Sequence, residues 1–476
     1  MSTHSLEEIL HPRSIAVVGA SDSPASSGYG FTEFLLQHEF KGTIYPVNPK
    51  YSEILGVKVY PSLRDIPGSV DYVISCIPAR EVLGMLDDCS EKGVKAVHLF
   101  TARFSETGHR EPARLEQEIL KRARKWGIRI IGPNCRGVYY PRQGICFSYD
   151  FPKEAGSVGM ISQSGGAAVL FVPSASLRGI RFSKVISYGN ALDFNECDYL
   201  DYLSQDPETK IILMYVEGVR NGKGFLASLR RAASTKPVIV LKGGRGESGG
   251  RMVTSHTASL AGSMRIWETL VTQAGAISVG SIEEMEDLAV SFYFLPPISG
   301  LRVGITGGSG GPSVLAADEC EEEGLNVIPL PQEMREELKS MGASIWDWIG
   351  NPADISMLGG FQFTSSDMLQ MMARNQRFDF LVAHIIALPL RRKEERMKRL
   401  RAEVEGYIRV KKESSKPLLA VVADSSVGID DYDDLRWKVI CEVRTNLIVA
   451  GIPFYPTMRR AARAAKKLIS YYQERR

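Results

Sequence analysis

Short apolar runs recur along the chain, and between them lie longer stretches whose apolar residues have helical spacing. The first third contains the runs SIAVVG, TIYPVN, DYVISCIP, AVHLF and IRIIGPN. The stretches 79–93 and 111–127 each combine helical spacing with a closing glycine, a pattern typical of amphipathic helices. Strands that alternate with helices predict an α/β fold, in which helices cover both faces of a parallel sheet.

The alternation restarts twice, which predicts three domains. The runs SVGMIS, RFSKVIS, KIILMYVEG and KPVIVLKGG predict the strands of a second doubly wound sheet. The joint FLPPISG then precedes LRVGITGG, LNVIPLP, FDFLVAHIIAL, KPLLAVVAD and GIPFYP, which predict the strands of a third. We therefore divide the chain into residues 1–145, 146–294 and 295–476, in agreement with a typical domain length of about 150 residues.

Composition and charge narrow the class of protein. Apolar residues make up 44% of the 476 residues and charged residues 24%, as in ordinary soluble globular proteins. The formal net charge of +3 is small for this length and argues against a nucleic-acid partner. No apolar run has the length of a membrane span or a signal peptide, so we expect no membrane partner either.

The cysteines indicate a reducing compartment. They stand at positions 76, 89, 135, 146, 197, 320 and 441, without the spacing of a metal site. Their odd number fits poorly with a disulfide framework. We therefore expect a cytoplasmic protein that holds no metal ion of its own.

The first glycine-rich turn, VVGASDSPASSGYG, follows the first predicted strand but lacks the full G-x-G-x-x-G of a dinucleotide site. An NAD site places an acidic residue at the end of the second strand, where this chain reads YPVNPK. Lys50 at this point suits a ligand with an additional phosphate, which CoA and NADP both carry. The alternative is that VNP only forms a turn.

Two further glycine-rich turns, ISQSGG and ITGGSGG, lead directly into predicted helices. Their small residues include Ser164, Gly165, Gly166, Gly308, Ser309 and Gly310. Free backbone N–H groups at a helix N-terminus bind anions, and small residues let an anion approach closely. Two such turns in one chain suggest that they share a phosphate.

His256 stands among small polar residues in GGRMVTSHTASLAGS, a composition that predicts a loop. Such a loop would carry a neutral imidazole to the phosphate, where the ring would act as a nucleophile. Glu217, just after the strand in MYVEGV, lies where open α/β sheets bind ligands and would hydrogen-bond the other ring nitrogen. The alternative is a solvated loop histidine.

The ordered series of motifs resembles the α subunits of the ADP-forming (NDP-forming) acyl-CoA synthetases, relatives of succinyl-CoA synthetase. The motifs extend over essentially the whole chain and read AVVGASDSP, YPVNPK, GPNCRG, SQSGG, YGNALD, YVEGV, KPVIVLKGGR, SHTASLAG, GGSGG and NPADIS. The resemblance implies a CoA-binding Rossmann-like domain followed by two flavodoxin-like domains, the first of which carries the histidine segment.

The resemblance also implies roles for residues that match the family's motifs. The histidine of the SHT segment is transiently phosphorylated in the family, which points to His256, and the glutamate of the EG turn supports it, which points to Glu217. The SQSGG and GGSGG turns become the two helix N-termini that hold the phosphate. The residues implied in CoA binding are Gly19, Ser21, Lys50, Pro78, Asn134 and Cys135.

The implied reaction converts acyl-CoA, phosphate and ADP reversibly into the free acid, CoA and ATP. Phosphate attacks the thioester to form an acyl phosphate, the histidine takes the phosphoryl group, and its segment delivers the group to ADP. We expect ATP or ADP, with Mg²⁺, to bind a separate β subunit, because no ATP-grasp segment follows the third domain. The resemblance also implies an α2β2 assembly, which is common in the family.

Two arginines depart from the family pattern. Arg103 in TARF stands where the family usually has glycine, and Arg136 follows GPNC, where the family usually has an apolar residue. Guanidinium groups pair with carboxylates and sulfonates, so two arginines at the acyl pocket predict an acid with a second anionic group. The alternative is that both arginines face solvent.

Two other functions stay open from the sequence. A CoA- or acyl-CoA-binding regulatory protein that has lost catalysis is disfavoured by His256, Glu217 and the two glycine-rich turns, because a pure binder has no need of them. An NADP-dependent oxidoreductase would use the first domain but leaves the second and third domains unexplained.

Overall fold

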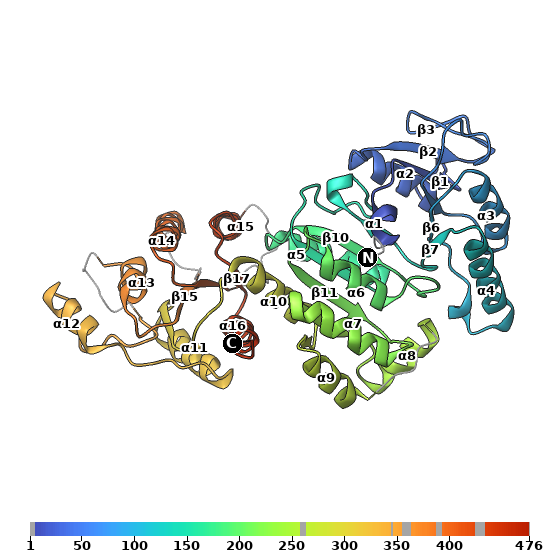
Figure 1. The fold of residues 1–476 in the computed structure, drawn as a ribbon. Coiled ribbons are helices and arrows are strands. Elements are labelled where there is room, and N and C mark those ends of the chain that lie inside the picture. Colours follow the sequence, from blue (N-terminus) through green and yellow to red (C-terminus); the bar gives the residue numbers. More distant parts are fainter. Residues whose placement is uncertain are drawn as a thin grey trace. The chain divides into compact units, whose positions relative to one another are not determined.

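A computed structural model describes residues 5–257, 263–343, 346–354, 363–386, 393–423 and 434–475 (Figure 1). The chain divides into two compact units, Met1–Met285 and Glu286–Arg476, which we treat separately. In both units helices alternate with the strands of a mainly parallel sheet, so the α/β prediction is confirmed. Of the described helices, none is long and apolar enough to cross a lipid bilayer.

The first sheet lies in the N-terminal part of the first unit and is wholly parallel, with the order β2-β1-β5-β6-β7. Its strands are β1 Ser14–Val18, β2 Thr43–Val47, β5 Tyr72–Ser75, β6 Ala96–Leu99 and β7 Arg129–Ile131. The helices are α1 Ser5–Leu10, α2 Ser27–Gln37, α3 Val82–Glu91 and α4 Arg110–Lys125, and a small hairpin joins β3 Glu53–Ile54 to β4 Val57–Lys58. All five strands match predicted apolar runs. Strands β1, β5 and β6 are buried along almost their whole length, as strands covered on both faces require continuous apolar sequence.

The second sheet has the order β13-β12-β11-β9-β10-β8. The predicted runs form β9 Val158–Ser162, β10 Phe182–Ser187, β11 Ile211–Val216 and β12 Val238–Lys242. The sequence analysis missed two edge strands, β8 Gly137–Tyr139, which is antiparallel to β10, and β13 Ile277–Val279. Three residues are too few to show a periodic pattern. The helices are α5 Gly165–Leu177, α6 Glu196–Gln205, α7 Gly222–Thr235, α8 Glu247–Thr257 and α9 Met264–Gln273.

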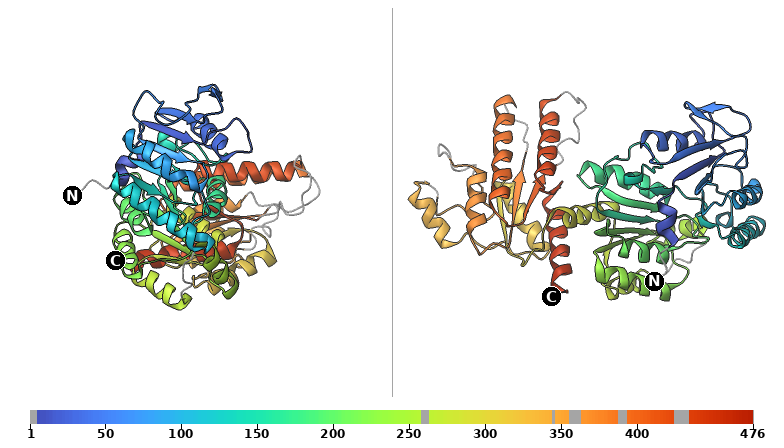
Figure 2. Two further views of the ribbon diagram at one scale, coloured as in Figure 1. Left: turned by 90° about the vertical axis from the view of Figure 1, so that its right-hand side faces the viewer. Right: turned by 45° about the horizontal axis from the view of Figure 1, so that its top comes forward.

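The second unit contains a four-stranded parallel sheet with the order β14-β15-β16-β17, and Figure 2 shows helices on both of its faces. Its strands are β14 Val303–Gly307, β15 Phe380–Ile385, β16 Leu418–Val422 and β17 Phe454–Tyr455. Helix α10, Ile282–Phe294, leads into this unit from the first. The further helices are α11 Gly310–Glu322, α12 Gln332–Ser340, α13 Ser365–Arg374, α14 Lys393–Glu413, α15 Leu435–Val449 and α16 Met458–Gln473.

The strand predicted at LNVIPLP is wrong. Asn326 forms an isolated bridge to Arg302, and the segment around Pro329 and Pro331 joins no ladder of the described sheet. Proline has no backbone N–H to donate to a neighbouring strand, so the apolar run cannot pair along its length. It serves instead as the connection from α11 to α12.

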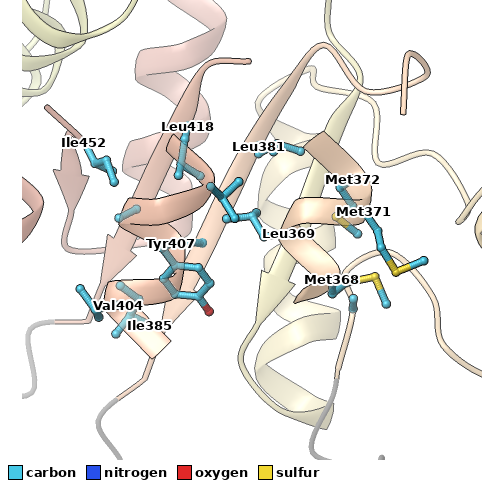
Figure 3. Packing of buried hydrophobic residues seen from close by; sticks show 14 of the residues in the cluster. Met368, Leu369, Met371, Met372, Leu381, Ile385, Val404, Tyr407, Leu418 and Ile452 are labelled. Carbon is cyan, nitrogen blue, oxygen red and sulfur yellow. The ribbon is translucent and has the colours of Figure 1, made fainter. Parts of the chain in front are cut away.

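A methionine-rich core fills the second unit on one side of its sheet (Figure 3). Helix α13 packs there against α14 and β15, and the buried side chains include Met368, Leu369, Met371, Met372, Leu381, Ile385, Val404, Tyr407, Leu418 and Ile452. Full burial of one such apolar side chain stabilises the fold by about 1.5–3 kcal/mol. The core includes Leu381 and Ile385 of β15, the strand that pairs with β14.

Strand β8 lies close to the domain boundary predicted at residue 145. This strand precedes residue 145, yet it pairs with β10 of the second sheet. The boundaries drawn from the sequence at 145 and 294 therefore stay a prediction.

A buried ion pair in the second sheet gives a test of the fold. The Lys184 ammonium is 1% exposed and lies 2.9 Å from Asp206 Oδ2 and 2.8 Å from Glu208 Oε2. Lys184→Ala would leave the buried Asp206 carboxylate without its cation, whereas Glu208 would keep its ion pair with Arg142 at 3.0 Å. We therefore expect the free energy of unfolding of the first unit to fall by about 3–5 kcal/mol in urea denaturation. Lys153→Ala is the control, because Lys153 pairs with Glu39 at the surface, and it should change that free energy by less than about 1 kcal/mol. Equal losses in both variants would contradict the prediction.

Candidate active site

A pocket of about 750 Å³ lies in the first unit, where the carboxyl ends of strands from its two sheets meet. The first sheet contributes residues that follow β5, β6 and β7, and the second sheet contributes residues that follow β9, β10 and β11. Ser26 and Ser27, at the start of α2, complete the lining. Open α/β sheets bind ligands at this end of their strands, so the pocket is the candidate active site.

Many residues singled out in the sequence line this pocket. They are Pro78, Arg103, Asn134, Cys135, Arg136, Ser164, Gly165, Gly166 and Glu217. They come from turns far apart in the sequence, which only the packing of the two sheets brings together. Their roles in binding and catalysis stay predictions.

The other predicted residues lie elsewhere. Gly19, Ser21 and Lys50 follow β1 and β2 and are not part of the pocket lining. The turn 308–310 belongs to the second unit, so a phosphate shared between the two glycine-rich turns stays a prediction. The side chain of His256 lies outside the described residues.

The turns after β1 and β2 are tied to each other. Gly19 has a φ of +87°, and a Cβ on Gly28 would lie 2.0 Å from the Gly19 carbonyl oxygen, so α2 can start this close to β1 only with glycine. The Asn48 amide donates from Nδ2 to the carbonyl of Ala20 at 2.7 Å, and its Oδ1 accepts the N–H of Lys50 at 2.9 Å. The VNP segment therefore does form a turn, and that turn also fixes the backbone of Lys50.

Helix α5 presents its N-terminus to the pocket. Ser164 Oγ accepts a hydrogen bond from the N–H of Ala167 at 3.3 Å, which leaves the N–H groups of Gly165 and Gly166 for a ligand. Beside a Cβ placed on Gly166, the nearest heavy atom among the described residues is Ser164 Oγ at 3.8 Å. Gly166 thus faces open space within the pocket.

Arg136 lies over the start of α5. A Cβ on Gly165 would lie 2.6 Å from Arg136 Cγ, so glycine at 165 makes room for the arginine as well as for an anion. The guanidinium carbon lies 5.5 Å from the centre of the Phe100 ring, and the Arg136 N–H donates to Ser187 Oγ at 3.1 Å. The N-terminus of a helix attracts anions, so the anion expected from the sequence at the start of α5 stays a prediction.

The turn that carries Glu217 is held by neighbours on the second sheet. Gln163 Oε1 accepts the N–H groups of Glu217 and Gly218 at 2.7 and 3.1 Å, and Lys242 Nζ donates to the Glu217 carbonyl. Tyr215 donates its hydroxyl to Glu217 Oε1 at 3.3 Å. The sequence analysis missed Gln163, because a single glutamine inside SQSGG has no distinctive spacing.

The two sheets meet backbone to backbone beside the pocket. Gly189 has a φ of +54°, and a Cβ there would lie 2.2 Å from the carbonyl oxygen of Pro133 and 2.4 Å from that of Asn134. Asn190 donates its N–H to the Pro133 carbonyl at 3.0 Å and its Nδ2 to Glu106 Oε2 at 2.7 Å. The YGNALD motif thus clamps GPNCRG, and Asn190 is a second residue that the sequence analysis missed.

Arg103 occupies a left-handed backbone position with a φ of +76°. This conformation disfavours a residue with a Cβ by about 1–2 kcal/mol relative to glycine, in agreement with the glycine expected at this position from the resemblance. The Arg103 N–H donates to Glu106 Oε1 at 2.5 Å, which helps to hold the turn. The exposed side chain also lines a neighbouring pocket of about 620 Å³, together with Arg80 and Arg114.

Burial keeps two titratable groups behind the pocket wall neutral. It raises the pKa of the Cys135 thiol to about 12 and lowers the pKa of His98 to about 4. The His98 ring bonds through Nε2 to the Cys135 carbonyl at 3.0 Å. A protonated thiol is a poor nucleophile, so the pKa gives no support to a nucleophilic role for Cys135, and its predicted contact with CoA stays a prediction. Among the described residues, no group of three His, Cys, Asp or Glu side chains could hold a metal ion.

The residues around His256 form a helix, so the loop predicted for residues 249–263 is wrong for residues 249–257. Helix α8 covers Glu247–Thr257, and Glu247 pairs with Arg251 one turn later at 2.8 Å, which favours helix over loop. The helix lies beside the short 3₁₀ turn η2, Ser105–Thr107, which follows Arg103 at the pocket. The backbone of His256 therefore belongs to an element next to the pocket-lining segment. Residues 258–262 lie outside the described ranges.

Comparison with known proteins agrees with the motifs. A CoA-binding domain matches residues 13–141, and a succinyl-CoA-ligase-like flavodoxin domain matches residues 155–292. The α subunit of ADP-forming acetate–CoA ligase II from Pyrococcus furiosus is 36% identical over 468 residues, which covers 98% of this chain and 97% of the relative. The α subunit of ligase I from the same organism is 32% identical and covers 98% of both chains.

A solved structure resembles the whole chain. The dinucleotide-forming acetyl-coenzyme A synthetase 1 of Candidatus Korarchaeum cryptofilum, in complex with phosphate and ADP, matches with a TM-score of 0.81 at 30% identity. The match covers 99% of this chain and 98% of that chain. The predicted resemblance and fold are therefore confirmed.

The contact between the two sheets yields a prediction. Gly189→Ala would place a Cβ against two carbonyl oxygens at a left-handed position, so we expect the free energy of unfolding to fall by about 2–4 kcal/mol in urea denaturation. Gly84→Ala is the matched control. Gly84 lies inside α3, a Cβ there meets no described heavy atom within 4 Å, and the change should be neutral or stabilising by up to about 1 kcal/mol. A Gly189→Ala variant as stable as the control would refute the close contact.

Proposed function

This chain belongs to the α subunits of the ADP-forming acyl-CoA ligases, and from this membership we propose that it interconverts a carboxylic acid, CoA and ATP with acyl-CoA, ADP and phosphate. One observation carries the proposal: a single pocket gathers the GPNC turn, the SQSGG turn and Glu217. The proposed reaction requires these residues in one place, because the phosphate must meet first the thioester and then the histidine. Relatives of equal length that are ADP-forming ligase α subunits support it.

The first sheet would bind CoA. The thioester end would lie in the pocket beside Asn134 and Cys135, and the pantetheine would pass the start of α2, since the N-terminus of a helix suits a pyrophosphate. The tied turns after β1 and β2 would meet the remaining phosphate through Lys50. The full set of proposed contacts is Gly19, Ser21, Lys50, Pro78, Asn134 and Cys135.

The second sheet would bind the phosphate. Held by the N–H groups of Gly165 and Gly166 and faced by Arg136, a phosphate oxygen would attack the thioester carbon, and the C–S bond would break to release CoA and leave an acyl phosphate. A ring nitrogen of His256 would then attack the phosphorus, and the carboxylate would leave. Glu217 would hydrogen-bond the other ring nitrogen, fix its tautomer and stabilise the positive charge on the ring.

The second half of the reaction would need a partner. We propose that the phosphoryl group on His256 passes by the turn at 308–310 to ADP on a β subunit, which would carry the ATP-grasp domain and the Mg²⁺ that accompanies the nucleotide. The relatives that match this chain over its length are themselves α subunits, which supports such a partner. An α2β2 assembly and a cytoplasmic location belong to the same proposal.

Neither alternative from the sequence is favoured. An NADP-dependent oxidoreductase would need only the first sheet, whereas the pocket also depends on residues that follow β9, β10 and β11. A CoA-binding protein without catalysis would have no use for the hydrogen bonds of Gln163 and Lys242 that hold the Glu217 turn toward the pocket.

The phosphohistidine gives the first test. After incubation of the chain and its β subunit with Mg-ATP, intact mass spectrometry should show an acid-labile gain of one phosphoryl group. His256→Asn should abolish the gain, because an amide nitrogen is not a nucleophile. If the wild-type chain gains no mass while its bound partner is active with another α subunit, the catalytic proposal fails.

The two arginines predict substrate choice. Because both line the pocket, we propose an acid with a second anionic group, so Arg136→Leu and Arg103→Gly should each lower the ratio of kcat/KM for a dicarboxylic over a monocarboxylic acid by about 10-fold to 100-fold. Arg103→Gly should also raise the free energy of unfolding by about 1 kcal/mol, because it relieves the left-handed position. Arg80→Leu, outside this pocket, is the control. An unchanged ratio in both test variants would show that the arginines do not select the acid.

A further inference from the structure

Lys242, the last residue of β12 and part of the motif KPVIVLKGGR, is a buried cation bound to two turns. The residue is 5% exposed, and its Nζ donates to the backbone carbonyls of Glu217 and Gly243. The first carbonyl belongs to the turn after β11, and the second to the turn that leads from β12 into α8, the helix that contains His256. One ammonium group therefore joins the turns that carry both predicted catalytic residues.

The side chain of Glu217 lies against the second of these turns. A Cβ on Gly243 would lie 3.2 Å from Glu217 Cγ and 2.6 Å from the hydroxyl oxygen of Tyr215, so glycine at 243 leaves room for both side chains. Gly243 also donates its N–H to the Val216 carbonyl at 2.8 Å. The Glu217 carboxylate is thus carried beside the backbone to which Lys242 binds.

The surroundings of Lys242 suit a positive charge. A buried charge is costly unless polar or charged groups compensate it, and the two carbonyl oxygens do so in part. The Nζ also lies over the ring of Trp267, from α9, at 5.9 Å from the ring centre. Burial lowers the pKa of Lys242, whereas the Glu217 carboxylate raises it. The interaction is mutual, so the ammonium group favours the ionised form of Glu217.

The tyrosines that face the same carboxylate are neutral. Tyr188, after β10, and Tyr215, in β11, both interact with Glu217. Burial raises the pKa of Tyr215 to about 12 and that of Tyr188 well above its ordinary value, so neither is ionised near pH 7. Burial also raises the pKa of Glu196, which interacts with Tyr188 from the start of α6. These groups supply no positive charge to Glu217.

Two arginines lie in neighbouring segments. Arg136 lines the candidate active site together with Glu217 and reaches it from the segment after β7. Arg245, three residues after Lys242, is directed to α9 and β13, where it lies 3.8 Å from Glu268 and donates to the Val279 carbonyl at 3.5 Å. Lys242, by contrast, binds the backbone of the Glu217 turn itself.

We propose that Lys242 is a positioning residue of the phosphohistidine reaction, whose ammonium group keeps the Glu217 carboxylate ionised and fixes its turn against the turn that leads into α8. The inference rests on the proposed function, in which Glu217 accepts a hydrogen bond from the His256 ring and stabilises the positive charge on it. A protonated Glu217 has no negative charge with which to do so. Lys242 would act through Glu217 and would touch neither the phosphoryl group nor the histidine.

An NMR titration of the full-length chain, labelled with ¹³C at the glutamate carboxyl carbons, tests the effect on Glu217. The signal of Glu217 is the one that Glu217→Gln removes. Lys242→Met removes the cation and should raise the midpoint of this titration by at least about one pH unit, because the ionised form loses a favourable neighbour. Lys242→Arg keeps a cation and should leave the midpoint within about 0.3 pH units of wild type.

Lys236 provides the matched control. It precedes β12 at the opposite end of the strand, and its Nζ donates to the carbonyls of Leu203 and Asp206, each at 2.6 Å. Both lysines thus bind two backbone carbonyls, but those bound by Lys236 lie far from the pocket. Lys236→Met should lower the urea concentration at the midpoint of unfolding, as Lys242→Met does, and should leave the titration of Glu217 unchanged. Lost stability alone therefore cannot imitate the expected shift.

The rate at which Mg-ATP phosphorylates His256 in the complex with the β subunit tests the consequence. The reaction needs the Glu217 carboxylate, so its rate falls as the pH falls through the midpoint of Glu217. In Lys242→Met this fall should begin at least about one pH unit higher, which lowers the rate below the wild-type midpoint about tenfold. In a Glu217→Gln background, Lys242→Met should shift the pH profile no further, because the group through which it acts is absent.

The NMR titration decides the proposal. A midpoint of Glu217 that moves by less than about 0.3 pH units in Lys242→Met, or that moves equally in Lys236→Met, would overturn it. If Lys242→Met does not fold, Lys242→Gln takes its place with the same expected shift, because its amide can donate a hydrogen bond but carries no charge. A wild-type complex that forms no phosphohistidine would refute the proposed function, and the titration would still show whether Lys242 keeps Glu217 ionised.

Discussion

The candidate active site depends on one backbone contact, in which Gly189 lies against the carbonyl oxygens of Pro133 and Asn134. This contact joins the carboxyl end of β10 to that of β7, so two separate sheets share a pocket. The hydrogen bond from the Asn190 N–H to Pro133 and the bond from its side chain to Glu106 reinforce it. The pairing of β8, which directly follows the GPNC turn, with β10 supports the same junction.

The groups around the pocket differ in charge. The wall behind the pocket is neutral, because burial keeps the Cys135 thiol protonated and the His98 ring uncharged. Against this wall stands Arg136, whose Cγ would lie 2.6 Å from a Cβ on Gly165 at the start of α5. A cation and the positive end of a helix dipole both attract anions, so this part of the pocket favours an anionic ligand over a cationic one.

The sequence predicts the scaffold better than the details of the site. Continuous apolar runs identify β1, β9 or β15, because burial on both faces leaves a long signal. The three-residue strand β8 shows no such apolar run. The prolines at 329 and 331 prevent strand pairing in a segment whose apolar composition alone predicts a strand. Gln163 and Asn190 act through single hydrogen bonds to distant turns, and no local pattern of residues reveals a bond of that kind.

The two glycine-rich turns differ in their caps and in the polar groups around them. At α5 the serine cap is closed, and the Cγ of Arg136 would lie 2.6 Å from a Cβ on Gly165. At α11 the cap is open, the donors of His384 and Ser313 are neutral, and the carboxylate of Asp354 lies close by. A hydrogen bond to an ion is stronger than one between neutral groups, so the two turns offer an anion different surroundings. Under the proposed function, the first turn would hold free phosphate for attack on the thioester.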